Sequence, residues 1–204
     1  MAEAAKKENA WSMIKLGLVL CAYAVVACAL LAVVNNFTAP KIAQNQERKV
    51  SQAMAEFFPD KGLKFETVTD FTPPVVGAIT VDDIYVAKKD GKIIGGAAQV
   101  TGPTYDQGTI LIGITTDGIV TGLKFLKLSD SPGFGLKAND ATFTLPNGKP
   151  FYGQFEGKNA AAGFKAGENF DAISGATITS VAVSSLINEG TKNLLAYFDI
   201  KGAK

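Results

Sequence analysis

The chain has 204 residues, of which 47% are hydrophobic, and a formal net charge of +1. This length suits one anchored domain of ordinary size rather than two large ones, and scattered lysines without a basic run give no sign of nucleic-acid binding. The sequence contains no histidine, which excludes Ser-His-Asp and Cys-His catalytic groups and histidine metal ligands. Any chemistry therefore depends on carboxylates, lysines or a bound cofactor. We assign no metal ligand and no catalytic residue from the sequence.

The first predicted element is a membrane-spanning helix. Residues 16–34 are nineteen residues without a charge, and as a helix they extend about 28 Å, close to the hydrocarbon thickness of a bilayer. A cleaved signal peptide and a lipidated Cys28 are the alternatives. Both are less favoured, because the apolar run continues past Cys28 through Val34. We expect an N-terminal tail at 1–15 and a transmembrane helix at 16–36.

Flanking charges leave the orientation of this helix open. Three basic residues lie on each side, namely Lys6, Lys7 and Lys15 before it and Lys41, Arg48 and Lys49 after it. The positive-inside rule therefore gives a tie. A short N-terminal tail favours a cytoplasmic N-terminus, which is the commoner arrangement for an uncleaved anchor.

The remaining chain predicts a connecting helix followed by a domain at 61–204. Residues 37–60 have helical apolar spacing, and Pro59 predicts the end of the helix; the apolar positions are Ile42, Val50, Ala53, Met54 and Phe57. Two strand pairs surround the turn dipeptides Asp90-Gly91 and Asp117-Gly118.

After these hairpins, residues 129–140 read as a loop, and 142–155 predict one or two further strands. Residues 178–198 predict a final amphipathic helix, with an apolar stripe at Val183, Leu186, Ile187, Leu194, Tyr197 and Phe198. The fold class is therefore α+β, a twisted antiparallel sheet packed with helices.

Residues 133–138, GFGLKA, match a dinucleotide-binding fingerprint formally. That motif requires a helix directly after it, and the following residues NDATFTLPNGK do not predict one. The alternatives are a proline-glycine turn between strands or a flat loop that presents Phe134 to a planar ring.

A second candidate is DAISGATITS, residues 171–180, at the entrance of the final helix. Ser174 or Thr177 can cap the helix, although no glutamate completes a capping box. Small residues at a helix start also form an anion site, because free N–H groups and the helix dipole favour phosphate. A Walker loop is excluded by its missing motif. From the residues alone, a cap and a phosphate site both remain open.

Residues 171–177 resemble the D-x-x-[ST]-G-A-T pattern of proteins that carry covalent FMN on threonine. In that family a flavin transferase joins the FMN phosphate to the last threonine of the pattern, here Thr177. Residues 128–135, LSDSPGFG, resemble the family's loop H-x-E-T-P-G-L-G, which packs on the flavin ring. A third segment that resembles the family is TAPKIAQNQ at 38–46, just outside the membrane helix. Over nearly its whole length the chain is similar to the G subunit of Rnf-type electron transport complexes.

The resemblance implies specific roles, and it also has departures. Thr177 is the implied attachment residue, and Asp171 is implied to serve recognition by the transferase. The implied FMN-binding residues are Asp130, Ser131, Pro132, Gly133, Phe134, Gly135, Ser174, Gly175, Ala176 and Ser180, with Lys158 as a weaker candidate that also reads as a solvated surface lysine. Leu128, Asp130, Ser131 and Phe134 stand where the family has histidine, glutamate, threonine and leucine.

The resemblance implies a membrane-anchored electron carrier that works with other subunits of an ion-translocating ferredoxin:NAD oxidoreductase. Its soluble domain is expected to face the periplasm or cell exterior. One alternative is a counterpart of the C subunit of a sodium-translocating NADH:quinone reductase, or a stand-alone flavin relay. Another is a non-redox anchored binding or assembly module in which residues 174–177 only cap a helix.

Overall fold

The computed structural model describes residues 2–60 and 62–203, with side chains from residue 11 onward. It divides into two compact units, residues 1–47 and 48–204. Met1, Lys61 and Lys204 lie outside the described residues, and with them the outer limits of the predicted tail at 1–15 and of the predicted domain at 61–204. The side chains of Lys6 and Lys7, used above to compare flanking charges, also lie outside the described part.

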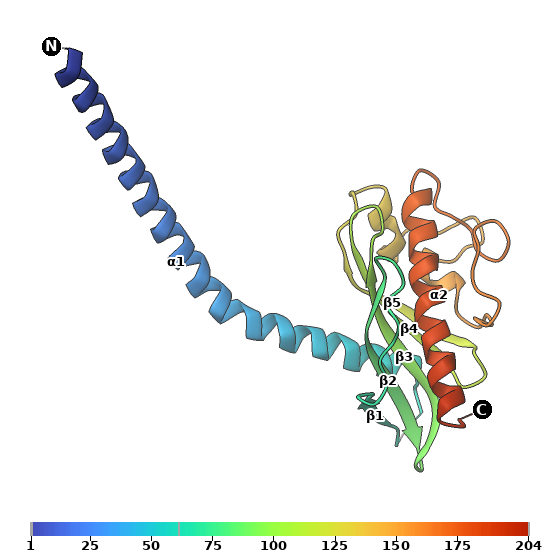
Figure 1. The fold of residues 1–204 in the computed structure, drawn as a ribbon. Coiled ribbons are helices and arrows are strands. Elements are labelled where there is room, and N and C mark those ends of the chain that lie inside the picture. Colours follow the sequence, from blue (N-terminus) through green and yellow to red (C-terminus); the bar gives the residue numbers. More distant parts are fainter. Residues whose placement is uncertain (1, 61, 204) are drawn as a thin grey trace. The chain divides into compact units, whose positions relative to one another are not determined.

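The N-terminal unit is helical throughout its described residues. It belongs to α1, Ala2–Phe57, which runs without interruption through the two segments expected as separate helices (Figure 1). Pro40 lies inside α1, where its ring removes one backbone hydrogen bond without ending the helix. No glycine or turn dipeptide accompanies it, and the Thr38 hydroxyl donates to the Val34 carbonyl oxygen at 2.8 Å. The apolar side chains of residues 16–34 are exposed, and the helix is long and apolar enough to cross a membrane.

The C-terminal unit is built on a five-stranded antiparallel sheet in which neighbouring strands follow chain order (Figure 1). The strands are β1 Lys64–Thr67, β2 Thr80–Lys89, β3 Lys92–Gly102, β4 Gly108–Thr115 and β5 Val120–Leu128. Both predicted hairpins are confirmed. Asp90 and Gly91 have positive φ angles of 50° and 81°, as a tight turn between twisted strands requires. The short edge strand β1 was not predicted, because its four residues are all exposed and show no alternation.

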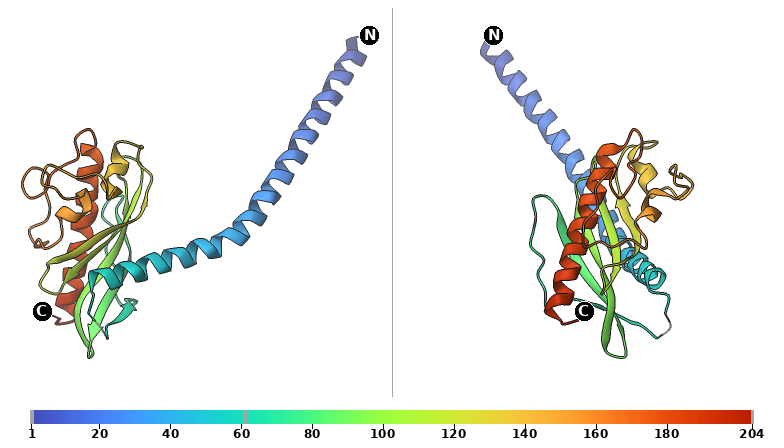
Figure 2. Two further views of the ribbon diagram at one scale, coloured as in Figure 1. Left: turned by 180° about the vertical axis from the view of Figure 1, so that it is seen from behind. Right: turned by 90° about the vertical axis from the view of Figure 1, so that its right-hand side faces the viewer.

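Helices cover the two faces of this sheet. The final helix, α2 at Thr177–Ile200, runs along one face (Figure 2), and its predicted stripe is buried. Alternate residues of β4 divide between the faces: Ile110, Ile112 and Ile114 belong to the core under α2, whereas Leu111 belongs to the core on the other face. Alternation of this kind follows from the period of two in a strand.

The end of α1 covers the second face. Val50, Ala53, Met54 and Phe57 are buried there, which agrees with the helical spacing in the sequence. Ile42 has the same helical spacing, but its side chain is 58% exposed. It lies in the N-terminal unit.

The ring of Phe57 occupies a slot in the sheet made by two paired glycines. Gly113 and Gly122 are cross-strand partners in β4 and β5. A Cβ atom at Gly113 would lie 2.6 Å from the Phe57 ring, and one at Gly122 would lie closer still. Only glycine permits this approach, and the slot fixes the end of α1 on the sheet.

Residues 129–176 form turns and two short 3-10 helices, η1 at Gly135–Asn139 and η2 at Phe151–Gln154. The further strands expected within 142–155 are absent from the described residues, so that prediction is wrong. Pro146 and Pro150 lack the N–H groups that a strand ladder needs. Instead, this segment folds over a cluster of buried aromatic rings, namely Phe151, Phe155, Phe164 and Phe170.

Candidate functional site

Three segments that are distant in the sequence meet around a cavity of about 590 Å³. The segments are the turn between β3 and β4, the loop after β5 and the start of α2. The lining residues are Tyr105, Ser131, Pro132, Phe134, Gly135, Gly175, Ala176, Thr177, Ile178 and Thr179. Residues from the loop that is expected to pack on the flavin ring and from the Ser-Gly-Ala-Thr segment thus line one cavity.

Thr177 is the first residue of α2, and its side chain is exposed at this cavity. The residue at the N-cap position is Ala176, and no side-chain hydrogen bond caps the helix. The interpretation of Ser174 or Thr177 as a helix cap is therefore wrong. Ser174 and Gly175 lie in the turn before the helix, so Ser174 is two residues too early and Thr177 is already helical.

The hydroxyl groups of Thr179 and Ser180 make hydrogen bonds within the fold, although Thr179 also lines the cavity. Ser180 is fully buried; its hydroxyl accepts the Ile173 N–H at 2.9 Å and donates to the Ala176 carbonyl oxygen at 2.9 Å. Thr179 donates to the carboxylate of Asp130 at 2.5 Å. The predicted role of Ser180 in FMN binding thus falls on a side chain that stabilises the turn and does not line the cavity.

Asp130 is a buried carboxylate at the back of the site. It accepts hydrogen bonds from the hydroxyl groups of Thr104 and Thr179, each at 2.5 Å, and from the N–H groups of Tyr105 and Asp106 at 3.2 and 3.1 Å. Burial by itself raises the pKa of this carboxyl, but the four hydrogen bonds together outweigh burial and hold its pKa below the usual 3.8. Asp130 therefore remains ionised at neutral pH and joins all three segments of the site.

Gly135 is required by the same cluster. A Cβ atom at this position would lie 2.6 Å from the Asp130 Oδ2 atom and 2.6 Å from the Thr179 hydroxyl. Any side chain would break the hydrogen bond between them. The second glycine of the formal dinucleotide motif is thus explained by packing. The five-residue 3-10 helix η1, which begins at Gly135, is not the long helix that a dinucleotide fold needs.

The outer walls of the cavity are large and apolar but unusually exposed. Tyr105, Phe134 and Ile178 are 67%, 58% and 64% exposed, and the Phe134 ring lies near the backbone of Gly175. Exposed apolar groups gathered at a hollow indicate a ligand or partner surface. The sequence predicted Phe134 but missed Tyr105 and Ile178. The one available signal for Tyr105 was an aromatic residue in a Gly-Pro turn.

Several predicted site residues lie outside this cavity. Gly133 and Ser174 adjoin it in the chain without lining it. Lys158 and Asp171 line a separate, shallow hollow of about 330 Å³. The Lys158 ammonium group donates to the Asn169 carbonyl oxygen, and an oxygen of the exposed Asp171 carboxylate accepts a hydrogen bond from Asn147 at 3.2 Å.

Leu128, which replaces the family histidine, ends β5 opposite Gly108. It is half-buried and packs on the core under α2, and it is not a lining residue of the cavity. In this chain the position contributes packing rather than a titratable group.

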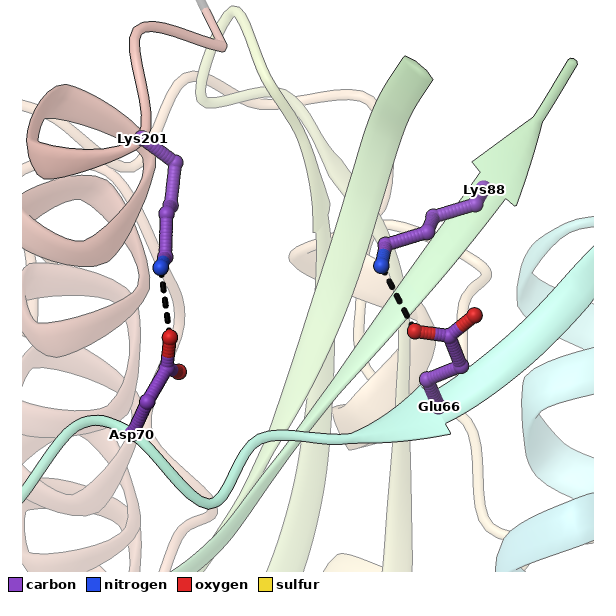
Figure 3. A network of polar contacts seen from close by, with 4 residues as sticks. All are labelled: Glu66, Asp70, Lys88 and Lys201. Carbon is purple, nitrogen blue, oxygen red and sulfur yellow. Dashed lines mark hydrogen bonds and ion pairs between the residues drawn. The ribbon is translucent and has the colours of Figure 1, made fainter. Parts of the chain in front are cut away.

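A larger hollow of about 800 Å³ lies between β1, β2 and the end of α2. Four of its charged groups form two ion pairs: Lys88 pairs with Glu66 at 2.6 Å, and Lys201 pairs with Asp70 at 2.5 Å (Figure 3). No predicted site residue lines it. Size alone therefore does not identify the functional site, whereas the cavity at Thr177 combines apolar walls with a free hydroxyl group.

The residues around this cavity fit a flavin mononucleotide. Its apolar and aromatic walls suit a planar ring, and the start of α2 suits a phosphate, because the first N–H groups of a helix have no partner within it. Comparison with family models agrees. Residues 1–57 match the model described as the RnfG N-terminal region, and residues 104–192 match the FMN-binding domain.

Relatives match over most of the chain. The G subunit of the Na(+)-translocating ferredoxin:NAD(+) oxidoreductase complex of Acetobacterium woodii is 32% identical, with 87% of this chain and 90% of the relative covered. The G subunit of the ion-translocating oxidoreductase complex of Pseudomonas aeruginosa is 30% identical over 92% and 89% of the two chains, and that of Erwinia tasmaniensis is 30% identical over 87% of each. The chain therefore belongs to the family of G subunits of ion-translocating oxidoreductase complexes and is a membrane-anchored protein with an FMN-binding domain.

Proposed function

We propose that this protein is a membrane-anchored electron carrier that bears FMN covalently on Thr177. The observation that carries the proposal is the position of Thr177: it is the first residue of α2, it is exposed, and it stands at the edge of an apolar cavity. The family membership supports FMN as the cofactor.

The linkage is a phosphoester between the Thr177 Oγ1 atom and the FMN phosphate. In its formation the hydroxyl proton leaves, an O–P bond forms, and the bond between that phosphorus and the leaving group of the flavin donor breaks. A flavin transferase catalyses this step. Asp171, exposed and six residues before Thr177, serves recognition by that enzyme.

The chain's own residues position the group. The first turn of α2 favours the phosphate through its N–H groups and helix dipole. Gly175 and Ala176 let the backbone approach it closely, and residues 131–135 support the ring. Bound FMN supplies the electron-transfer chemistry, while the protein supplies orientation and electrostatics.

We infer the wider assembly from the relatives. One of them is named as part of a Na(+)-translocating ferredoxin:NAD(+) oxidoreductase complex. By analogy this chain relays electrons within a complex of several membrane subunits that couples ferredoxin and NAD to ion movement. A covalent tether suits a domain outside the cytoplasm, where lost FMN could not readily be replaced.

Thr177→Val tests the attachment, because valine keeps the shape of threonine and removes the hydroxyl group. The wild-type full chain, co-expressed with a flavin transferase, is expected to keep flavin fluorescence after denaturing electrophoresis. Mass spectrometry of the peptide containing Thr177 should show the mass of one FMN group. The Thr177→Val protein should lose both signals and remain folded, because the side chain is exposed.

The matched control is Thr142→Ala, which removes an exposed threonine hydroxyl in another loop and should leave the fluorescence unchanged. A wild-type protein that stays colourless under these conditions would contradict the proposed function and favour a non-redox anchored module. Fluorescence that persists in the Thr177→Val protein would place the attachment elsewhere.

A further inference from the structure

Tyr105 is the least expected member of the cavity wall. It lies in the turn between β3 and β4, far in sequence from both motifs that suggested a site. Its side chain is 67% exposed, yet it lines the same cavity as Phe134 and Thr177. An aromatic side chain offers a large apolar face and, in tyrosine, a polar end that tolerates water. Its position allows contact with a ring seated in the cavity.

The backbone at Tyr105 is held firmly although the side chain is exposed. The N–H groups of Tyr105 and Asp106 and the hydroxyl group of Thr104 all donate to the buried Asp130 carboxylate. Three consecutive residues of the turn therefore share one acceptor. The backbone that carries the Tyr105 side chain is therefore ordered before a ligand binds, which lowers the cost of binding.

The same carboxylate relates this turn to the attachment residue. Thr179 donates to Asp130 at 2.5 Å, and Thr179 and Thr177 both lie in the first turn of α2. The support of Tyr105 and the helix that carries Thr177 are thus tied to one group. Their separation is set by the fold, so a ring tethered to Thr177 meets Tyr105 in a reproducible position.

We propose that Tyr105 is a flavin-contact residue whose phenol ring packs against the isoalloxazine system of the FMN tethered to Thr177, with Asp130 as its positioning residue. This inference rests on the proposed function. Phenol and indole rings in contact with a photoexcited flavin give it an electron and regain that electron afterwards, which quenches its fluorescence. A phenyl ring does not, so the proposal has a spectroscopic readout that is independent of electron-transfer activity.

The test measures the fluorescence lifetime of the full-length flavinylated protein in detergent. Tyr105→Phe is expected to lengthen the lifetime by removing the quencher while keeping a ring of similar size. Tyr105→Trp should restore short lifetimes. Tyr152→Phe, which changes a tyrosine outside the cavity wall, is the matched control and should match the wild type. Because Tyr105 is exposed and the control removes only a hydroxyl group, all of these proteins should fold normally.

Mass spectrometry of the Thr177 peptide accompanies each lifetime measurement and separates the two hypotheses. If every variant carries FMN and the Tyr105→Phe lifetime equals the wild-type value, Tyr105 is not a ring contact, while the proposed function stands. An equal lengthening in the Tyr152→Phe protein would also overturn the inference, because the effect would not be specific to the cavity wall. Absence of FMN from wild-type Thr177 would overturn the proposed function and the inference together.

Discussion

Asp130 is the residue that connects the β3–β4 turn, the loop after β5 and the start of α2. Asp130 lies in the loop after β5, is almost fully buried, and accepts three hydrogen bonds from the turn and one from the start of α2. Hydrogen bonds to a buried charge are stronger than those between neutral groups, and leaving one partner unsatisfied is costly. Asp130 therefore holds the segments around the cavity together, although it is not one of the lining residues.

Asp130→Asn keeps the size of the side chain but offers one acceptor oxygen in place of two, so its amide N–H groups would face other donors. We expect the free energy of unfolding to fall by about 1–3 kcal/mol, measured by urea denaturation in detergent with circular dichroism. Asp117→Asn, at an exposed turn position, should change it by about 0.5 kcal/mol or less.

The pH dependence gives a second measure of the same group. The pKa of Asp130 is lower in the folded chain than its ordinary value, so its ionised form stabilises the fold. This contribution is fully present above about pH 4 and is lost as the pH falls through the lower folded pKa. The Asp130→Asn protein should lose less stability than the wild type over that acid range. Identical acid profiles in the two proteins would contradict this account.

At the scale of elements, the sheet is stabilised from both faces by helices from opposite ends of the chain. The stripe of α2 covers one face, and the last two turns of α1 cover the other. The second contact depends on the glycine slot in β4 and β5, which receives the Phe57 ring. The helix that contains the apolar segment 16–34 thus also supplies its final turns to the core of the C-terminal unit.

Phe57→Ala would empty this slot while leaving the helix intact. Truncation of a buried phenylalanine removes apolar contacts and leaves a cavity, so we expect a loss of about 3–5 kcal/mol in the free energy of unfolding. Thermal unfolding followed by circular dichroism measures it. Phe65→Ala, on the exposed edge strand β1, is the control and should have a much smaller effect. Equal losses in both proteins would show that the slot does not anchor α1.

At the scale of the whole molecule, one apolar helix anchors a domain whose proposed cofactor site lies at the start of α2. The family membership supports the membrane anchor. The charges on either side of the anchor leave the orientation open, so the proposed placement of the domain outside the cytoplasm depends on the function inferred for the complex.

Cysteine labelling tests this orientation directly. Cys21 and Cys28 are the sequence's two cysteines, and both lie in the apolar segment, so their replacement by alanine gives a clean background. In that background, Asp117→Cys should react with a membrane-impermeant maleimide in intact cells or spheroplasts. Glu3→Cys, before the membrane helix, should react only after permeabilisation. The reverse pattern would place the FMN-binding domain in the cytoplasm.

Local patterns predicted much of the fold because neighbouring residues determine them. Asp90-Gly91 allows the positive φ angles of a tight turn, and the period of the stripe from Val183 to Phe198 is that of a helix with one buried face. The prediction of one or two further strands at 142–155 was wrong, because Pro146 and Pro150 cannot donate to a strand ladder. The covalent site at Thr177 came from a motif, and it remains a prediction.

By itself, the sequence determined the apolar N-terminal helix, the two hairpins, the amphipathic final helix and the two motifs that carry the family resemblance. Only the tertiary structure decided that these motifs share one cavity, that Tyr105 and Ile178 complete its walls, and that Asp130 and Ser180 serve the fold beneath it. It also placed Lys158 and Asp171 in a separate hollow. The physical reason is that turns and helices follow from neighbours along the chain, whereas a cavity is made by segments that only the packing of sheet, loop and helix brings together.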